Sequence, residues 1–539
     1  MTAAISHDDS HPAAGASSLW LALLPFAAFL ALVWGLSSQP LPWRASLPWV
    51  PSLGIDLAFH VDGFAAQMLA LITGIGSLVF VYASGYLAHE PRRGRLLAVL
   101  LLFMLAMIGA VTADNLILLF VFWELTSLTS FLLVGFKHET AAARASARQA
   151  LLVTLGGGLA LLAGMLLLGD MAGTWSISGI IAAAPGLLDD PRLNPALALI
   201  MLGAFTKSAQ FPFHFWLPNA MSAPTPVSAY LHSATMVKLG IYLLARLDTA
   251  FNEVWFWEAS LLGIGTLTAV WAAVLALRER DLKRILARST VAALGLLTLL
   301  IGLPGPDAGL AVIAFLFAHA LYKAPLFMVA GNIDHATGTR SIDRLMGLRR
   351  TMPWTAAIAV LAGLSMAGLP LSFGFVAKSV ISSAKAESGG LLLVSGATVL
   401  VNALVFAVAA VAAVRVFWGP GSPETTRVVH EVPWSMRLPP LLLVLLGLEF
   451  EFLPTVADPL LLEAARSISP GLAREGLAAT YDLSSMLSVA GVTAFIGLLF
   501  FVAWDRLHRL LYLARRVDRF GPAARSEERR VGKECRSRW

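Results

Sequence analysis

The chain has 539 residues, of which 58% are hydrophobic and only 13% are charged, and its mean hydropathy is +0.75. Soluble domains carry about 25% charged residues, so these values indicate a protein whose solvent is largely lipid. The net charge of +6 is modest, and no basic run is interleaved with aromatic residues, which argues against a nucleic-acid-binding surface. A single cysteine, Cys535, excludes both a disulfide framework and a cysteine-based metal site.

Apolar runs long enough to cross a hydrocarbon core of about 30 Å recur along the whole chain. They predict an all-α integral membrane protein of about fourteen spanning helices, several of which contain a break. The predicted spans are 18–36, 62–85, 94–112, 114–136, 146–169, 196–217, 224–246, 257–278, 285–303, 309–331, 352–383, 391–418, 437–455 and 483–513. The longest polar stretches, 37–61, 170–195, 332–351 and 456–482, are interpreted as connectors.

The two ends of the chain differ from the rest in composition. Residues 1–17 lack the basic n-region of a signal peptide and are interpreted as a short polar arm. Residues 525–539 (RSEERRVGKECRSRW) are polar and resemble translated sequencing adapter, so we exclude them from the fold. On that interpretation, we expect the natural protein to continue past about Ala524.

The loops between the predicted spans test this assignment, because lysine and arginine collect on the cytoplasmic side of a membrane. Alternate loops are basic, and the loops between them hold little positive charge. The basic loops contain Arg92, Arg93 and Arg95; Lys137, Arg144 and Arg148; Arg278, Arg280, Lys283 and Arg284; Arg340, Arg344, Arg349 and Arg350; and Arg506, Arg509, Arg515 and Arg516. One alternation therefore fits the whole chain and places both termini in the cytoplasm.

Ionisable residues inside the predicted spans are the main functional signal, because a charge at mid-bilayer costs about 2.5–3.5 kcal/mol on insertion scales. Glu124 lies halfway along its span, and the nearby hydroxyls of the LTSLTS segment could hold its carboxylate or a water molecule. Lys207 lies five residues before Pro212, where the missing backbone donor predicts a broken helix. A carboxylate and a lysine at this depth could each take up and release a proton. The structural alternatives are a helix-locking ion pair for Glu124 and an amine that extends to the membrane surface for Lys207.

Three later spans continue the series. Lys238 follows His232 by six positions in a segment opened by Pro224 and Pro226. Both could carry protons, but the alternative for His232 is a purely structural hydrogen bond to a neighbouring helix. His319 and Lys323 are four residues apart and share one helix face, which suits a proton relay, although one of the two could be permanently neutral.

The last member, Lys378, lies in a span interrupted by Pro370 and Gly374. Two interrupted, lysine-bearing helices, at Lys207 and Lys378, indicate an internal repeat with a site at the repeat interface. One acid, four lysines and two histidines on successive helices predict a proton conduit.

Several energy-coupling signals are absent from the sequence. There is no G-x-x-x-x-G-K-[ST] loop, and Gly156, Gly157 and Gly158 lie within a predicted span rather than in a dinucleotide fingerprint. No histidine pair has convincing haem or metal spacing, and nothing indicates a hydrolase triad. We therefore predict no catalytic residues, metal or cofactor, and expect the energy to come from an ion gradient or a partner subunit.

Five segments carry a family resemblance: FWELTSLTSFLLVGF, KSAQFPFHFWLPNAMSAPTPVSAYLHSATMVK, DLKRILARST, HALYKAPLFMVAG and GLPLSFGFVAK. Together they resemble the antiporter-like membrane subunits, which include subunits of multisubunit (Mrp/Pha-type) Na⁺/H⁺ antiporters and proton-pumping subunits of respiratory complex I. Glu124 with its flanking sequence looks most like the Mrp A subunit. The resemblance implies two inverted five-helix repeats, with N-terminal helices at 18–112, a proton-antiporter core at 113–418 and C-terminal helices at 419–524.

By motif match, the resemblance implies a route from the pair Glu124 and Lys207 through Lys238 and His232 to a central Lys323 with His319, ending at Lys378. Lys283 falls in the matching DLK motif, but its span places it at the cytoplasmic end, so it ranks lower. The implied protein is a secondary transporter subunit, not an enzyme, that moves H⁺ and Na⁺ or K⁺. Its expected partners are the other membrane subunits of a hetero-oligomer in the cell membrane. The alternatives are a proton-pumping subunit of a complex I-type NADH–quinone oxidoreductase and a non-transporting assembly scaffold.

Overall fold

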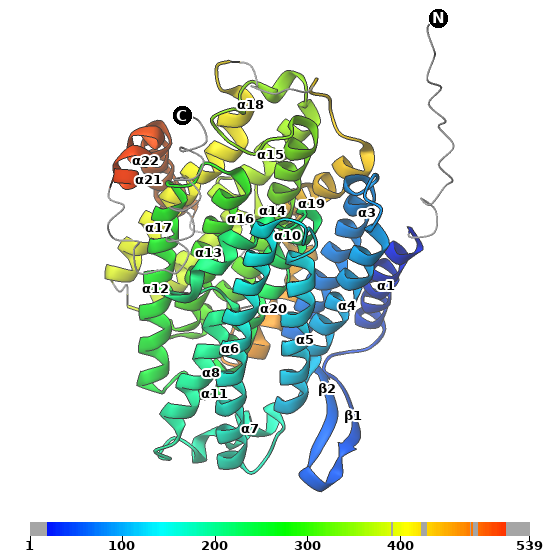
Figure 1. Ribbon diagram of the computed structural model, residues 1–539. Coiled ribbons are helices and arrows are strands. Elements are labelled where there is room, and N and C mark those ends of the chain that lie inside the picture. The colour runs from blue at the N-terminus through cyan, green and yellow to red at the C-terminus, as the bar shows by residue number, and fades with distance from the viewer. Residues whose placement is uncertain (1–18, 390–391, 422–427, 475, 478–482, 514–539) are drawn as a thin grey trace, which may run out of the picture.

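A long bundle of helices forms the protein, with a β-hairpin projecting from one end (Figure 1). The computed structural model describes residues 19–389, 392–421, 428–474, 476–477 and 483–513. The expected polar arm and the adapter-like segment both lie outside the described residues.

Each of the fourteen predicted spans coincides with a helix or an interrupted helix. Eight described helices are long and apolar enough to cross a membrane without a sharp break. They are α2–α3 (Gly63–Tyr86), α4 (Arg93–Thr112), α5 (Leu116–Val134), α6 (Ala141–Ala172), α12 (Trp255–Ala276), α13 (Leu282–Ile301), α14 (Pro306–Thr337) and α17–α18 (Leu392–Trp418). The prediction of a multi-span, all-helical membrane domain is confirmed.

The other six predicted spans are bent, broken or short helices. Two pairs bend sharply: α19 (Trp434–Phe452) with α20 (Pro454–Ile468) by 88°, and α21 (Leu483–Val502) with α22 (Trp504–Leu513) by 65°. The rest are α1 (Leu23–Ser38), α8 (Leu193–Lys207), α10 (Thr225–Ser233) with α11 (Leu239–Phe251), and α15 (Pro353–Ala367) with α16 (Phe373–Glu387).

The bundle has two chemically distinct ends, which we call the hairpin end and the basic end. At the hairpin end, Asp62, the residue after the β-hairpin, pairs with Arg246 of α11, and the Asp114 amide just before α5 donates to the Ala58 carbonyl oxygen at 2.8 Å. These contacts join the β-hairpin to α5 and α11. At the basic end, ion pairs join neighbouring arginine-rich loops and the helix ends beside them. These pairs are Arg92–Glu139, Arg340–Asp281, Arg280–Asp505 and Arg415–Asp505. These loops, which the sequence predicts to share one membrane side, therefore lie at the same end of the bundle.

A five-element order occurs twice along the chain. In the first group α4 and α5 precede the 32-residue α6, then the broken segment that begins with α8, then α10–α11. In the second group α12 and α13 precede the 32-residue α14, then the broken pair α15–α16, then α17–α18. Each of the five elements in a group runs from one end of the bundle to the other, and five is odd, so the two groups start at opposite ends. Helix α4 starts at the basic end and α12 starts at the hairpin end (Figure 1). The second group is thus inverted relative to the first, as the resemblance implies.

Local sequence explains where several of these helices begin. Asn115 caps α5 by accepting from the Ile117 and Leu118 amides at 3.0 and 3.2 Å, and Thr140 and Asp281 cap α6 and α13 in the same way. Side-chain acceptors at such positions satisfy amides that have no partner within the helix.

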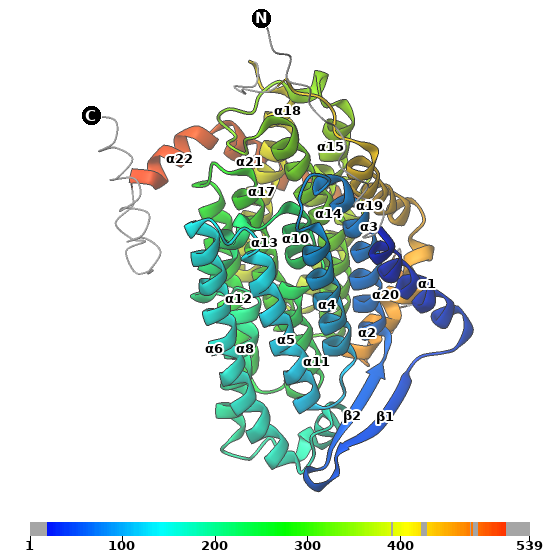
Figure 2. The same ribbon diagram turned by 45° about the vertical axis from the view of Figure 1, so that its right-hand side comes forward.

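The connectors contain more structure than expected. Residues 37–61 include an antiparallel hairpin of β1 (Trp43–Val50) and β2 (Ile55–Val61), which Figure 2 shows reaching beyond the helices. The connector 170–195 contains α7 (Ile177–Ala183), and the connector 456–482 contains most of α20. These segments are too short or too polar to produce a spanning signal, so their structure depends on contacts with the bundle.

Candidate functional site

Glu124 and Lys207 face each other across α5 and α8, beside the glycine-rich face of α6. The Lys207 ammonium is fully buried and donates to the Trp123 carbonyl oxygen at 2.9 Å and to Ser127 Oγ at 2.8 Å. It lies 5.0 Å from the centre of the Trp123 ring, a distance typical of cation–π contact. The Lys207 charge acts on the Glu124 carboxylate, yet the amine is bonded to the Trp123 carbonyl and Ser127 Oγ. The Lys207 ammonium is thus held by Trp123 and Ser127, which lie on either side of Glu124 in the sequence of α5.

The hydroxyls around Glu124 behave differently from expectation. Thr126 and Thr129 donate to the carbonyls of Trp123 and Leu125, each at 2.7 Å, and so bond to their own helix. Hydroxyls in helices often bond back to the preceding turn in this way. These two hydroxyls therefore donate to their own helix rather than to the Glu124 carboxylate, and the alternative that they hold a water molecule stays a prediction.

Space for the Glu124 carboxylate comes from α6. A Cβ added to Gly158 would lie 1.8 Å from Glu124 Oε1, and one added to Gly157 would lie 1.7 Å from Thr206 Oγ1. Glycine therefore permits both the close packing of α6 on α8 and the position of the acid. Glu124 Oε1 is buried and has no protein hydrogen-bond partner within the described residues.

The predicted break after Lys207 is present. Helix α8 ends at Lys207, and Ala209 adopts a left-handed conformation with φ 51°. The freed carbonyl of Phe205 accepts from the Gln210 amide at 2.8 Å, and that of Thr206 accepts from Trp216 Nε1 at 3.0 Å. Buried side chains and backbone thus satisfy the broken helix, as a break at membrane depth requires.

Lys238 lies at a second break, which the sequence did not reveal. Helix α10 ends at Ser233 and α11 starts at Leu239, and Lys238 occupies the short 3₁₀ turn between them. Its buried ammonium donates to the Leu316 carbonyl of α14 at 2.9 Å. Ser208, next to Lys207, donates to the carbonyl of Val237, next to Lys238, at 2.7 Å. The Ser208–Val237 hydrogen bond therefore joins the break after Lys207 to the break at Lys238.

His319 and Lys323 continue the series on α14. His319 is fully buried and lies within electrostatic reach of both Lys238 and Lys323. The Lys323 ammonium donates to Ser289 Oγ of α13 at 2.7 Å and lies 3.7 Å from Met366 Sδ of α15. His319 therefore lies between two lysines that come from different halves of the bundle.

Lys378 completes the line at the α15–α16 break. Its ammonium donates at 2.7 Å to the carbonyl of Ala367, the last residue of α15 and the neighbour of Met366. A cation at the carboxyl end of a helix is favoured by the free carbonyls there. Lys378 is partly exposed, unlike the fully buried Lys207 and Lys238.

His232 lies on a branch toward the basic end rather than on this line. Its ring is 6.3 Å from the Trp216 ring, and neither ring nitrogen has a hydrogen-bond partner in the described part of the chain. Lys283 lies within electrostatic reach of it. The Lys283 ammonium is fully buried and donates to the Ala223 carbonyl at 2.8 Å. Lys283 lies at the basic end of α13, as its span predicts, but its amine is buried because it is bonded to the segment before α10.

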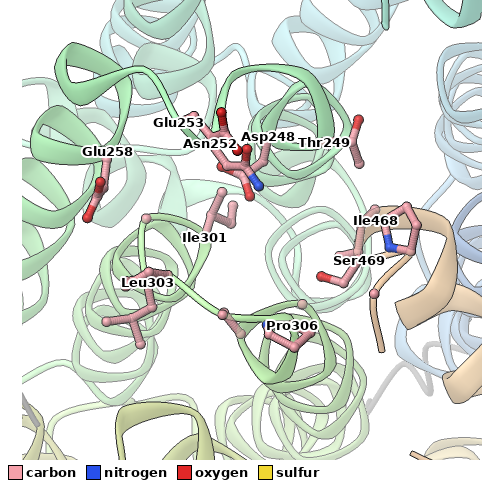
Figure 3. A pocket seen from close by; sticks show the side chains of 17 residues that line it. Asp248, Thr249, Asn252, Glu253, Glu258, Ile301, Leu303, Pro306, Ile468 and Ser469 are labelled. Carbon is pink, nitrogen blue, oxygen red and sulfur yellow. The ribbon is translucent and has the colours of Figure 1, made fainter. Parts of the chain in front are cut away.

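A cavity of about 350 Å³ lies apart from these residues, at the hairpin end. The ends of α11 and α13 and the starts of α12 and α14 line it, together with the turn after α20. Figure 3 shows Asp248 and Glu253 on one wall and Pro306 on the opposite one. No group of three or more metal-ligating His, Cys, Asp or Glu side chains occurs among the residues that the structure describes.

Two family descriptions match the chain. The family "NADH:quinone oxidoreductase/Mrp antiporter, TM" matches residues 113–403, which is more than half of the chain. The family "NADH-Ubiquinone oxidoreductase (complex I), chain 5 N-terminus" matches residues 47–96.

Similar proteins include antiporter subunits. A probable K(+)/H(+) antiporter A/B subunit of Rhizobium meliloti is 44% identical over 443 residues, which are 80% of this chain and 44% of that protein. The A-type Na(+)/H(+) antiporter subunit of Alkalihalophilus pseudofirmus is 42% identical over 460 residues, which are 80% of this chain and 57% of that protein. The chain thus spans about half the length of these curated relatives.

Two solved structures share the fold. A chain of the Mrp complex from a Dietzia species has a TM-score of 0.85 at 34% identity, over 98% of this chain and 57% of that one. A chain of the membrane-bound sulfane sulfur reductase, an archaeal respiratory membrane complex, has a TM-score of 0.75 at 25% identity, over 84% of this chain and 92% of that one. The chain therefore belongs to the family of membrane subunits shared by NADH:quinone oxidoreductases and Mrp antiporters.

Proposed function

We propose that the chain is the proton-conducting A-type subunit of a multisubunit Na⁺/H⁺ or K⁺/H⁺ antiporter. The relatives named as Na(+)/H(+) or K(+)/H(+) antiporter subunits support this proposal over a redox-driven pump. The observation that carries it is the line of contacts from Glu124 to Lys378. The charge of Lys207 acts on Glu124, and the charges of Lys238 and Lys323 act on His319. The Ser208–Val237 hydrogen bond links the neighbours of Lys207 and Lys238. Lys323 contacts Met366, and Lys378 donates to the adjacent Ala367 carbonyl.

In this mechanism protons move between neighbouring groups and no covalent chemistry occurs. Glu124 takes up a proton, and its changed charge alters the proton affinity of Lys207. The change passes through Lys238 and His319 to Lys323 and then to Lys378. Buried polar atoms without protein partners, at Glu124, His319 and His232, are positions where internal water would complete the relay. Exit of the cation would be coupled to this charge movement by repulsion.

Several further assignments belong to the same proposal. The core is residues 113–418, which contain all seven proposed path residues. The family match over 113–403 covers most of this range, while α4, the first helix of the first five-element group, lies just before it. The partners are the other membrane subunits of a hetero-oligomer in the cell membrane. The basic end faces the cytoplasm, because arginine-rich loops favour that side, and both termini lie there.

The test uses the complete set of antiporter genes in an antiporter-deficient host. Everted vesicles are energised, and the collapse of ΔpH is recorded on addition of Na⁺, K⁺ or choline. The proposal expects collapse with Na⁺ or K⁺ and none with choline. Proton movement that requires NADH and quinone, and does not respond to either cation, would instead identify a complex I-type subunit.

A further inference from the structure

The half of α16 nearest the hairpin end carries a polar face that extends beyond the seven proposed residues. Lys378, Ser382 and Lys385 are spaced i, i+4 and i+7, so they share one face of the helix. Lys385 lies about 10 Å further along the helix axis than Lys378. The Ser382 hydroxyl, between them, donates to the Lys378 carbonyl at 3.1 Å.

Lys385 is turned into the bundle. Its ammonium donates at 3.0 Å to Thr398 Oγ1 of α17, and Thr398 is only 1% exposed. Thr398 lies six residues after Leu392, the first residue of α17, which corresponds to about 9 Å along the helix. A lysine near a helix end ordinarily extends its amine to the aqueous surface. This amine instead points toward a buried hydroxyl.

The end of α16 meets an accessible cavity. Glu387, the last residue of α16, accepts from the backbone amide of Asp307 at 3.1 Å. Gly305 and Pro306, beside Asp307, line the 350 Å³ cavity at the hairpin end, where Figure 3 shows Pro306 across from Asp248. Asn252 and Glu253 on the rim of this cavity are exposed. The face that carries Lys378, Ser382 and Lys385 therefore runs from the mid-bundle break toward the hairpin end, where α16 ends beside this cavity through Glu387 on its other face.

We propose that Lys385 is a protonatable residue of the path between Lys378 and the aqueous phase at the hairpin end. A proton leaves the Lys378 ammonium, the neutral Lys385 amine accepts it through the Ser382 hydroxyl or water, and the resulting ammonium releases it to water. This inference rests on the proposed function, because it extends the same path by one step.

The test measures cation-dependent collapse of ΔpH in vesicles that contain the whole complex, at matched complex abundance. The variants are Lys385→Ala, Lys385→Arg and Lys385→His. The control is Lys137→Ala, which removes an exposed lysine from the loop between α5 and α6 at the other end of the bundle. Rates are recorded from pH 6 to pH 9, roughly the range over which histidine and lysine differ in protonation.

Lys385→Ala and Lys385→Arg should both lose at least about tenfold in rate, a loss on the scale of removing one proton-transfer group. Arginine keeps the charge and can donate to Thr398, but it does not release its proton. Lys385→His should retain transport with its optimum moved to lower pH. The inference would be overturned if Lys385→Arg transported at the wild-type rate, or if Lys385→Ala transported as fast as Lys137→Ala. Either result would leave the proposed function intact. Absence of exchange in the wild-type complex would overturn both.

Discussion

Glu124 Oε1 occupies the space into which a side chain at Gly158 would project, since a Cβ on Gly158 would lie 1.8 Å from that oxygen. Glu124 is on α5 and Gly158 is on α6, so the position of the acid depends on a neighbouring helix that carries no charge there. The carboxylate and Lys207 can interact only while this space stays open.

Replacement of Gly158 by alanine should therefore impair transport without changing any charge. The added methyl group displaces the Glu124 carboxylate, and we expect the rate to fall by about tenfold or more at matched abundance, since misplacement by about 1 Å can be that costly. Gly156→Ala is the control, because a Cβ at Gly156 meets nothing within 4 Å. Equal rates in the two alanine variants would show that the Glu124 position is unimportant.

Ser127 should matter more than the other hydroxyls of α5. Ser127→Ala removes one of the two acceptors of the Lys207 ammonium, and a hydrogen bond to a charged group is worth about 1.5–3 kcal/mol. Transport should fall by about tenfold. Ser130→Ala removes a hydroxyl that donates only to the Ser127 carbonyl, at 2.8 Å, and should leave the rate near wild type. The same vesicle assay compares the two variants, and a reversed order would contradict the site geometry.

The break before Lys378 offers a way to separate backbone strain from side-chain displacement. Gly368 and Gly389 have φ of 69° and 77°, so alanine at either position is strained by about 1–2 kcal/mol. A Cβ at Gly368 would also lie 2.3 Å from Lys378 Cδ, whereas one at Gly389 meets nothing within 4 Å. Both variants should lower the apparent Tm slightly, but only Gly368→Ala should slow transport. Thermal melts of the purified complex and vesicle rates measure the two effects.

The hairpin should stay attached to the bundle down to acidic pH. Burial opposes ionisation of Asp62, but the charge and hydrogen bonds of Arg246 and the Ala65 amide outweigh it, so the pKa of Asp62 lies below its ordinary value. A carboxylate whose pKa is lower in the folded state than in the unfolded state stabilises the folded state at neutral pH. That stabilisation is lost only as the pH falls through the lowered pKa.

Hydrogen exchange of the hairpin amides measures this attachment. Wild-type protection factors should hold from neutral pH to about pH 4 and fall below it. Asp62→Asn should lose protection already at neutral pH, while Asp56→Asn, which lies within β2 and outside the Arg246 pair, should not. Loss of protection near pH 6 in the wild type would show that another group controls the attachment.

Composition, span length and loop charge were enough to predict the helices, and prolines were enough to predict the breaks near Pro212 and Pro370. These signals are local, because a proline removes its own backbone donor wherever it lies. The break before Lys238 carries no such residue: Thr235 adopts an irregular conformation, and its hydroxyl donates to the Tyr230 carbonyl at 2.8 Å. Nothing in the sequence distinguishes that threonine from those inside regular helices.

The site was less predictable than the fold because its geometry depends on contacts between helices. Glu124 and Lys207 could be selected because charge in a membrane span is costly. The role of Gly158 could not be predicted, because the space that it leaves for the Glu124 carboxylate exists only once α5 and α6 pack together. Lys283 was placed at the cytoplasmic end of its span, and Lys385 lies just beyond the predicted span 352–383. Lysines at such positions usually reach water, and only the folded chain shows these two amines turned inward.

Glu124 and Lys207 are proposed to be the first two proton-transfer groups of the path. The most direct test compares Glu124→Gln and Lys207→Ala with Lys137→Ala in the complete complex. The measurement is Na⁺- or K⁺-dependent collapse of ΔpH in everted vesicles at matched complex abundance. Both pair variants should lose exchange by about a hundredfold while the complex assembles normally and Lys137→Ala transports at the wild-type rate. Exchange that persists in both pair variants would show that Glu124 and Lys207 only hold α5 and α8 together.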